Sequence, residues 1–552
     1  MKRISTAIAS ILLALVPLAA QEHLSERVYL STDKEVYVAG DDMFLSAFCI
    51  DKAGARLSGT SATAYVELIS AEGPVQTAKL ALTEGRGAGV LTILNAVPTG
   101  CYKLVAYTSQ CFNEDGYDFE EGARDVVIIN PFTSERSSSG VEIVEDEEYF
   151  ASAPTQTVQG TGDIEVSAAD GEITITNRSS KAVSLSVSLY NDDGIAAPQH
   201  SGIAAFIENA TVGKSFTPRR VIDYEGEVIR TKVRGVSADS LASLKGSYAY
   251  LSVPGRMSDV YLSRLDGSGN ATFYTRNIYG KTDAFLEIDS KGGVAHLDVE
   301  SPFKGVKASG LEPLRLCSGL EPLVSRRSVA MQVARASQAD TLYEYLEIPE
   351  DRIFSGDANE YILDDYTRFP LMEELFIEFI HEVKARKAES GRVLTILLND
   401  SFKPSQFSQL QSLALLDGVP VLDQNRIFDY DPLLVERILV YPHTYNFGEW
   451  YFAGVVNFIT YKHTLPSYEF DESVRVVDFQ GESYPVAAYM PSAESSLPDL
   501  RQTVLWHPLV EIAPGQKRTL HYTLPSYEGD FKLVVEGVDE GLAPQYNSIP
   551  VE

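Results

Sequence analysis

Apolar and polar residues alternate in short runs along most of the chain, a pattern typical of β-strands that bury one face. Between residues 27 and 131 these runs are separated by turn signals such as Ala39-Gly40-Asp41-Asp42. Regular short strands with turns between them favour a β-sandwich. The strands expected in this region are residues 27–30, 35–38, 43–50, 64–69, 89–93, 101–108 and 125–129.

The same alternation returns in three later regions and predicts further β-structure there. Two stretches are less regular: residues 195–218 give no clear reading, and residues 311–359 predict one or two strands and a linker. The further strands expected are residues 173–176, 183–190, 228–233, 247–253, 260–264, 270–274, 284–288, 473–479, 484–489, 503–506, 518–524 and 531–538.

One region has a helical period instead. After Thr367 or Pro370, either of which could begin a helix, apolar residues recur at helical spacing and glutamates fill the positions between them. We expect this helix to pack on a sheet that contains residues 393–398. The apolar stripe is Met372, Leu375, Phe376, Phe379 and Val383.

Residues 413–462 predict strand, turn, short helix, strand, loop and strand. An apolar run, 413–416, leads into Asp417-Gly418, where Gly accepts a positive φ without steric cost. Asp431-Pro432 is a helix start, with a capping carboxylate and Pro at the first helical position. The runs 438–440 and 454–461 are strands, so residues 360–465 form a small α+β domain.

Residues 134–168 are poor in apolar side chains and contain the acidic run Glu145-Asp146-Glu147-Glu148. Such composition is typical of a solvated linker, which we favour over a calcium site. The predicted division is a signal peptide (1–20), a β-sandwich (21–132), an acidic linker (133–168), a β segment (169–218), an Ig-type β domain (219–305), a connecting segment (306–359), the α+β domain (360–465) and a C-terminal β domain (466–552).

The chain has 552 residues and a net charge of −31. Nucleic acids and anionic membranes both require a basic surface, so this acidity argues against either as a partner. The basic start Lys2-Arg3, the apolar run 7–18 and the small pair Ala19-Ala20 predict a secretory signal peptide. We therefore expect an exported protein.

The four cysteines are Cys49, Cys101, Cys111 and Cys317. An exported compartment permits disulfides, so we expect one bridge, between Cys101 and either Cys49 or Cys111. No C-x-x-C pair is present, which argues against a zinc ribbon or a thioredoxin-type site.

The zinc-binding His-Glu motif, the glycine-rich phosphate loop and the calcium-binding loop are each incomplete in this sequence. His381-Glu382 lacks a second His at position 385, and Gly85–Gly89 precedes a strand rather than a helix, so it predicts a hairpin loop and not a phosphate cradle. Asp266, Ser268 and Asn270 have the spacing of calcium ligands, but Asn277 replaces the required bidentate Glu. We expect no enzyme activity and no catalytic, cofactor-binding or metal-binding residues.

Three stretches resemble known families. Val28–Lys34, with Tyr37, Gly40 and Pro98–Tyr102, resembles the second macroglobulin-type domain of the macroglobulin and complement-like family. Leu265–Phe273 is similar to a hairpin of carboxypeptidase-regulatory-like Ig-type domains. The segment Leu416–Val421, with residues 435–440, Gly448 and Gly454–Lys462, resembles the plug domain of TonB-dependent outer-membrane receptors. These resemblances imply macroglobulin/Ig-like β-sandwiches around one α+β plug-like domain, in a mainly β, multidomain chain.

The resemblances also imply functions, and two features of the sequence argue against two of them. No cysteine lies in the C-x-E-Q thioester motif of covalent protease traps, and the 90 residues after Lys462 are too few for a receptor barrel. The combination of Thr32-Asp33-Lys34, Leu363–Pro370 and Leu416–Val421 looks like a family of Bacteroidetes envelope proteins. This resemblance implies a protein-interaction scaffold with envelope partners, in the periplasm, associated with the outer membrane or at the cell surface. The alternatives are a thioester-free protease-binding protein and an accessory ligand-binding component of a TonB-dependent uptake system.

Overall fold

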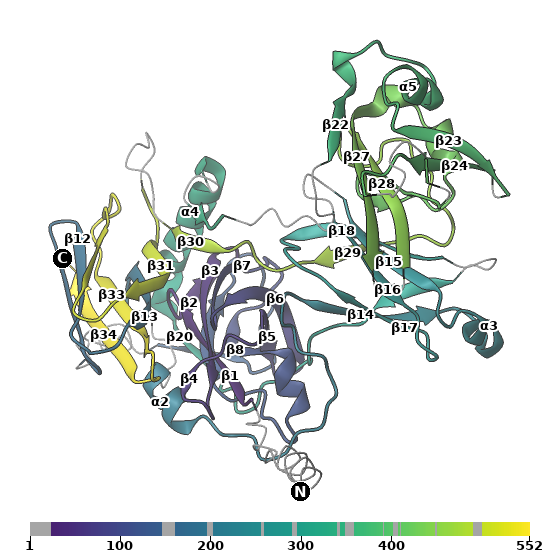
Figure 1. Cartoon of the computed structure of the whole chain (residues 1–552). Helices are drawn as coiled ribbons and strands as arrows, with labels where there is room; N and C mark the ends of the chain where they lie inside the picture. Colours follow the sequence, from purple (N-terminus) through teal and green to yellow (C-terminus); the bar gives the residue numbers. More distant parts are fainter. Residues whose placement is uncertain are drawn as a thin grey trace, which may run out of the picture. The chain divides into compact units, whose positions relative to one another are not determined.

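A computed structural model of the chain is mainly β, with several separate sheets (Figure 1), which confirms the predicted fold class. The structure describes residues 24–145, 160–195, 202–254, 259–289, 295–338, 343–347, 358–389, 391–400, 407–408, 410–447, 450–489 and 499–551. The predicted signal peptide, most of the acidic run and Gly448 lie outside these residues.

The chain forms two compact units that are interleaved in sequence. Unit 1 comprises Met1–Gly226, Phe303–Leu346 and Glu482–Glu552, and unit 2 comprises Glu227–Pro302 and Glu347–Gly481. Unit 1 thus contains both the first and the last described strands.

The first part of unit 1 is the predicted N-terminal sandwich. Its strands follow the order β1-β3-β7-β6-β5-β8-β9-β2, with β4 beside β3, around a core that includes Tyr37, Met43 and Tyr102. The expected strands are confirmed, and the structure adds β4 and the long β6. The bounds are β1 (Glu26–Thr32), β2 (Val36–Val38), β3 (Asp42–Asp51), β4 (Arg56–Leu57), β5 (Thr63–Ser70), β6 (Gly73–Thr83), β7 (Arg86–Thr92), β8 (Gly100–Tyr107), the 3₁₀ helix η2 (Ser109–Asn113) and β9 (Arg124–Ile129).

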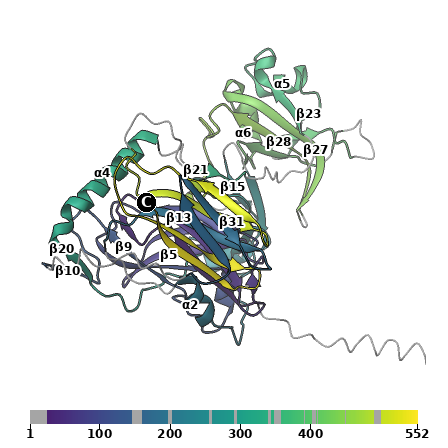
Figure 2. The ribbon, with the colours of Figure 1, turned by 90° about the vertical axis from the view of Figure 1, so that its left-hand side faces the viewer.

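A second sandwich in unit 1 joins segments from both ends of the chain. Its larger sheet has the order β21-β30-β31-β13-β33-β34, and its smaller sheet β11-β12-β32. Figure 2 shows β13, from the first half of the chain, beside strands coloured yellow from the C-terminus. The bounds are β11 (Ile164–Ala169), β12 (Glu172–Asn177), β13 (Val183–Asn191), β21 (Tyr343–Tyr345), β30 (Val486–Tyr489), β31 (Thr503–Ile512), β32 (Lys517–His521), β33 (Phe531–Asp539) and β34 (Pro544–Val551).

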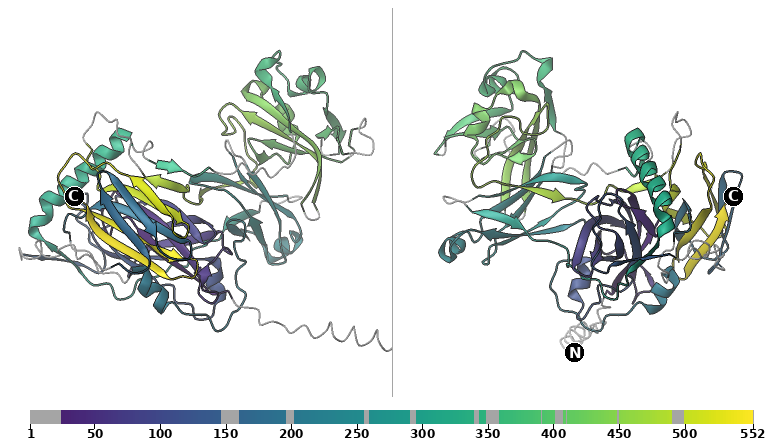
Figure 3. Two further views of the ribbon diagram at one scale, coloured as in Figure 1. Left: turned by 60° about the vertical axis from the view of Figure 1, so that its left-hand side comes forward. Right: turned by 180° about the vertical axis from the view of Figure 1, so that it is seen from behind.

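Two stretches of unit 1 expected to be irregular contain regular structure. The predicted acidic linker includes β10 (Val141–Val144), which pairs in parallel with β20 (Leu314–Cys317), and β11 begins within it. The predicted connecting segment contains a short 3₁₀ turn, η4 (Ser318–Leu320), and then the long helix α4 (Glu321–Gln338), which packs against β2 (Figure 3). Helix α2 (Gly202–Asn209) lies in the stretch that gave no clear reading.

Unit 2 has an Ig-like half and an α+β half. In the Ig-like half, sheet β17-β14-β19 faces sheet β16-β15-β18-β29, and β29 comes from the stretch assigned by sequence to the C-terminal domain. Its elements are β14 (Val228–Arg234), α3 (Ala238–Ser243), β15 (Tyr248–Val253), β16 (Asp259–Arg264), β17 (Asn270–Tyr274), β18 (Lys281–Ile288), β19 (His296–Val299) and β29 (Arg475–Gln480).

The α+β half is a five-stranded sheet, β22-β27-β28-β25-β26, with helices and the hairpin β23–β24 on one face. The strands β27 and β28 are its long central pair, light green in Figure 3. The bounds are β22 (Asn359–Ile362), η6 (Leu363–Asp365), α5 (Met372–Glu378), β23 (Val383–Ala388), β24 (Gly391–Ile396), β25 (Leu413–Leu416), β26 (Val419–Pro420), α6 (Asn425–Asp429), η7 (Pro432–Leu434), β27 (Val435–Phe447) and β28 (Trp450–Thr460).

The predicted helix of this domain is shorter than its apolar stripe suggested. Helix α5 ends at Glu378, and Val383 already belongs to β23. Met372, Leu375 and Phe376 are buried as expected, but Val383 reaches the same core from a strand. The apolar residues of the stripe therefore pack on one core, but they do not belong to one continuous helix.

The expected disulfide is wrong, because Cys49, Cys101 and Cys111 are all free thiols. Cys49 lies in the core of the N-terminal sandwich, whereas Cys101 packs with Val36 and Leu314 outside that core. Cys111 sits on η2 in a third cluster, where the backbone N–H of Thr108 donates to its sulfur at 3.4 Å. The three side chains thus face different parts of the unit.

Candidate functional site

The Thr32-Asp33-Lys34 motif connects the two sandwiches of unit 1. The Asp33 carboxylate is buried, accepts hydrogen bonds from the Tyr37 hydroxyl (2.8 Å) and the Phe44 backbone N–H (3.1 Å), and pairs with Lys34 at 2.8 Å. From the second sandwich, the hydroxyl of Thr503 donates to the same carboxylate. Since a buried charge is stabilised only when it is fully paired, this motif is a structural joint.

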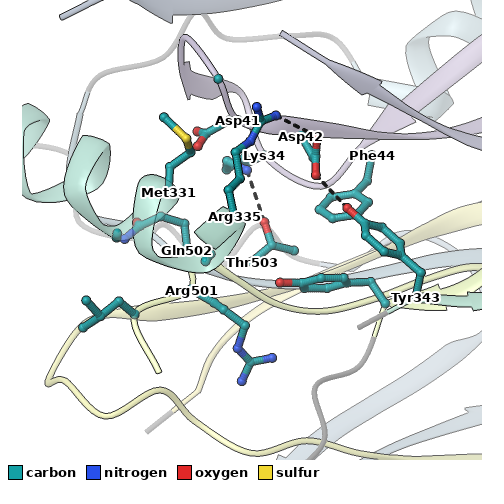
Figure 4. A pocket seen from close by; sticks show the side chains of 15 residues that line it. Lys34, Asp41, Asp42, Phe44, Met331, Arg335, Tyr343, Arg501, Gln502 and Thr503 are labelled. Carbon is teal, nitrogen blue, oxygen red and sulfur yellow. Dashed lines mark hydrogen bonds and ion pairs between the residues drawn. The ribbon is translucent and has the colours of Figure 1, made fainter. Parts of the chain in front are cut away.

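Figure 4 shows a cavity beside this joint. It has a volume of about 90 Å³, which is room for a few water molecules. Lys34 donates to Thr503 at 3.2 Å, and Arg335 of α4 pairs with Asp42 at 3.5 Å. The Tyr343 hydroxyl also donates to Asp42, at 2.7 Å. Each cation that lines the cavity has a carboxylate partner: Lys34 pairs with Asp33, Arg335 with Asp42, and Arg501 with Asp499.

Asp41, on the same wall, is partly buried and accepts a hydrogen bond from the backbone N–H of Val38 at 2.9 Å. Burial raises the pKa of this carboxyl group, with Lys34 opposing the shift. Its bond to its own turn assigns it a structural role as well.

The Asp417-Gly418 turn joins β25 to β26. Asp417 adopts φ 48° and is 1% exposed, and its carboxylate accepts hydrogen bonds from the backbone N–H and hydroxyl of Thr460, both at 2.7 Å, and from the Leu465 N–H at 2.8 Å. The carboxylate thus holds the end of β28 beside the turn. The predicted turn is confirmed, and its Asp serves the fold.

The Leu363–Pro370 segment is anchored in a similar way. The Arg368 guanidinium donates to the carbonyls of Pro432 (2.8 Å) and Val435 (2.9 Å), while Leu363 is buried in the core. The ring of Tyr366 stacks on Phe379 with a centroid distance of 4.2 Å. The segment is therefore held rigidly at one end of the α+β sheet.

Several large apolar side chains remain exposed at this end of the sheet. Ile362 is 44% exposed, Tyr366 43%, Leu433 53% and Tyr461 46%. We call these four residues the Tyr461 patch.

Hydrogen bonds and strand register bring together the segments that carry Ile362, Leu433 and Tyr461. The Tyr461 hydroxyl donates to Asp364 at 2.6 Å, and its backbone N–H donates to the Leu434 carbonyl at 3.2 Å. On the same outer face, the register sets Ile362 opposite Arg437 and Arg437 opposite Ile459, two residues before Tyr461. The bond to Asp364 raises the pKa of Tyr461, so its hydroxyl stays protonated.

Carboxylates border the patch. Arg437 pairs with Glu360 at 3.0 Å and Arg368 with Asp364 at 3.5 Å, so both guanidinium groups are neutralised locally. Exposed Asp365 and partly exposed Glu436 add negative charge, and exposed Lys462 is the nearby cation next to Tyr461 in sequence. The patch is thus an apolar surface with an acidic border.

The other residues singled out in the sequence serve local structure. Asp266 accepts hydrogen bonds from the N–H groups of Ser268 (2.8 Å) and Asn270 (2.9 Å), and the bonds from Asn270 lower its pKa. The turn is present, but β16 and β17 belong to different sheets, so the expected hairpin is instead a crossing between sheets. Gly85 has φ 78° in the hairpin between β6 and β7.

His381 does not lie on a helix, since it falls between α5 and β23. Its neighbour Glu382 accepts hydrogen bonds from Tyr361 (2.9 Å) and Asn359 (2.7 Å). Within the described residues, no three His, Cys, Asp or Glu side chains gather in a group that could hold a metal ion. No helix among those residues is long and apolar enough to cross a membrane.

The Tyr461 patch was not predicted from the sequence. Alternation distinguishes Tyr361, which packs on the core, from Ile362, which faces outward. The alternation at Tyr361 and Ile362 is therefore a signal that could have indicated an apolar residue on the outer face of a strand.

Comparisons with known proteins give distant likenesses. No family model and no curated protein matches the sequence. A structure of Escherichia coli alpha-2-macroglobulin activated by porcine elastase aligns with 96% of this chain and 43% of its own, at 7% identity and a TM-score of 0.24. Salmonella alpha-2-macroglobulin reacted with methylamine aligns at 9% identity over 97% of this chain and 24% of its own, with a TM-score of 0.16.

Dimeric latent PorU from Porphyromonas gingivalis aligns over 50% of this chain and 33% of its own, at 9% identity and a TM-score of 0.15. The chain spans less than half the length of each of these three structures. TM-scores of this size do not establish a common fold, so the macroglobulin-type and plug-type resemblances remain predictions from the sequence.

Proposed function

We propose that this chain is a non-enzymatic, exported protein-interaction module of the cell envelope, which binds a protein partner through the Tyr461 patch. The supporting observation is the patch itself: four large apolar side chains, each 43–53% exposed, on a rigid support. Apolar side chains scattered singly over a surface need no explanation, whereas these four lie on segments that hydrogen bonds from Tyr461 and Arg368 hold together.

The rigidity of the patch favours binding. Tyr366 is stacked on Phe379, and the Tyr461 hydroxyl is bonded to Asp364, so both rings lose little conformational freedom when a partner covers them. Fully burying one large apolar side chain stabilises a complex by about 1.5–3 kcal/mol, so half-exposed members contribute a fraction of that each. Four such side chains can anchor a specific contact when polar groups at the border add to it.

Site-specific photocrosslinking tests this function. A photoreactive amino acid is placed at Leu433, inside the patch, or at Tyr274, which is 64% exposed on β17 of the same unit and serves as the matched control. In cells of the native host, we expect Leu433 to give a discrete crosslinked protein that is absent with Tyr274. Equal products at both positions, or none at Leu433, would reject the proposed function.

Export is tested separately by fractionation of the same cells. We expect the mature protein to start after the Ala19-Ala20 pair and to be found in the envelope fraction. Recovery of an uncleaved chain in the cytoplasm would reject this part of the proposal.

A further inference from the structure

The charge around the Tyr461 patch indicates which kind of protein would bind there. Residues 359–378, which run from β22 through η6 to α5, contain six carboxylates and a single basic side chain, Arg368. That guanidinium is already committed to Asp364 and to two backbone carbonyls. The border is therefore negative, in a chain whose net charge is already −31.

The apolar area of the patch is too small to hold a partner alone. Four side chains that are about half exposed present roughly 400 Å² of surface, given that large side chains bury about 150–250 Å² each. A stable interface buries about 800 Å² per partner. The remaining attraction must come from the border, where carboxylates require cations opposite them.

The same charges disfavour a second copy of this chain as the occupant. A symmetric dimer would place the patch against itself and so set Asp365 and Glu436 against their own copies. Like charges brought together in this way cost free energy, so self-association is opposed by the border.

The two tyrosine rings also favour a cationic partner. One face of Tyr366 is stacked on Phe379 while the side chain is still 43% exposed, and the ring of Tyr461 is held by its bond to Asp364. A Lys or Arg side chain over such a ring gains about 0.5–1 kcal/mol at an exposed site.

We propose that the Tyr461 patch binds a polypeptide segment in which lysines or arginines flank one or two large apolar residues. This inference rests on the proposed function and adds the chemical class of the partner. The apolar residues cover Ile362 and Leu433, and the cations meet Asp365, Glu436 and the tyrosine rings.

Fluorescence anisotropy with the full mature chain tests the class of partner. The probes are three labelled peptides of equal length: one with Lys and Arg around Trp and Leu, one in which Ser replaces Trp and Leu, and one in which Glu replaces Lys and Arg. We expect the first to bind at least about tenfold more tightly than either of the others. Binding should weaken as the salt concentration rises, because exposed ion pairs are screened.

Two double variants place the binding at the patch. Asp365→Lys with Glu436→Lys reverses the border, whereas Asp239→Lys with Asp283→Lys makes the same change in net charge on exposed positions of the Ig-like half. We expect the border pair to weaken binding of the cationic apolar peptide at least about tenfold and the control pair to change it less than about twofold. Thermal melts of both variants check that they are folded.

The outcomes separate this inference from the proposed function. Equal weakening by both pairs would show a general attraction to an acidic chain and overturn the inference. Equal binding of the Glu-containing apolar peptide would overturn the cationic class while the patch still binds protein. A partner crosslinked at Leu433 that has no basic segment would do the same, whereas the lack of any crosslink rejects the proposed function itself.

Discussion

Asp417 is the residue on which the turn of the α+β domain depends most. Its carboxylate accepts three hydrogen bonds from Thr460 and Leu465, and its backbone has a positive φ that Asn also tolerates. Asp417→Asn keeps this backbone preference but directs an NH₂ group toward groups that donate. The substitution therefore isolates the role of the carboxylate.

We expect Asp417→Asn to destabilise unit 2 by about 2–3 kcal/mol, because hydrogen bonds to a buried charge are lost and donors are left unpaired. Hydrogen exchange of β25 and β28 amides and the thermal midpoint measure this. Asp365→Asn, at an exposed position of the same domain, is the control and should leave both unchanged. If the two variants behave alike, the carboxylate does not hold the turn.

Glu287 of β18 is a second residue with a specific consequence. It is 7% exposed, and burial, with the nearby charges of Asp471 and Asp289, raises its pKa to about 8. A carboxyl whose pKa is higher in the folded state favours folding when protonated. Its contribution is complete below about pH 4.5 and is lost as the pH rises through 8.

The stability of unit 2 should therefore fall between pH 4.5 and 8 by up to about 1.4 kcal/mol per pH unit from this group. We expect Glu287→Gln to remove that dependence and to be more stable than wild type at pH 8, since an uncharged amide has no ionisation cost there. Denaturant unfolding at a series of pH values gives the result, with exposed Glu300→Gln as control. Parallel pH profiles for wild type and Glu287→Gln would contradict the assignment.

At the scale of elements, helix α4 shows how one buried ion pair fixes a helix. Arg327 is 4% exposed, donates two hydrogen bonds to the Asp193 carboxylate and donates a third to the Val36 carbonyl at 3.1 Å. The planar guanidinium matches the carboxylate at two points, which a lysine cannot do.

We expect Arg327→Lys to increase hydrogen exchange in α4 at least about tenfold, because the helix opens more easily from β2. The adjacent Arg326 is exposed, so Arg326→Lys is a matched control that should leave exchange unchanged. Equal exchange in both variants would show that α4 is held by its apolar contacts alone.

The elements that the sequence predicted are those with a clean period. Strands such as β3 and β13 contain either a run of apolar residues or a regular alternation of apolar and polar residues, and these patterns predicted them. β34 was missed because it contains prolines at 544 and 550, and proline within a segment argues against a strand. The structure shows that β34 is an edge strand, where proline is tolerated. β6 was missed although Ala78, Leu80 and Leu82 alternate, because it begins with Gly73 and Pro74, which are typical of a turn.

Helix α4 and the patch were missed for a different reason. The buried side of α4 includes Arg327, and Val329 on the helix is exposed, so its apolar residues do not form a clean stripe. Pro322 in its first turn was the available signal. The patch depends on which apolar residues stay uncovered, and that is decided by β27, η7 and β28 together rather than by any one stretch.

At the scale of the whole molecule, the order of the segments in unit 1 ties the first strands to the last. β13 lies between β31 and β33, so both of its neighbours come from the C-terminal segment. Charged groups of the N-terminal sandwich also depend on that segment. Arg86 donates to the Pro508 carbonyl, and Arg124 pairs with Glu536 at 3.7 Å.

Removal of residues 482–552 should therefore unfold the second sandwich and weaken the first. β13 would lose its partners on both sides, and Asp33, Arg86 and Arg124 would lose partners in buried surroundings, which costs about 1–3 kcal/mol for each unsatisfied group. Limited proteolysis and hydrogen exchange of β1 and β3 measure the second effect.

The control replaces Glu227–Pro302 and Glu347–Gly481 with flexible linkers, which removes more of the chain but leaves unit 1 complete. We expect the control to protect β1 and β3 as the full chain does, since every strand pair of unit 1 is retained. Equal protection in the truncated chain would show that the N-terminal sandwich folds without its C-terminal partners.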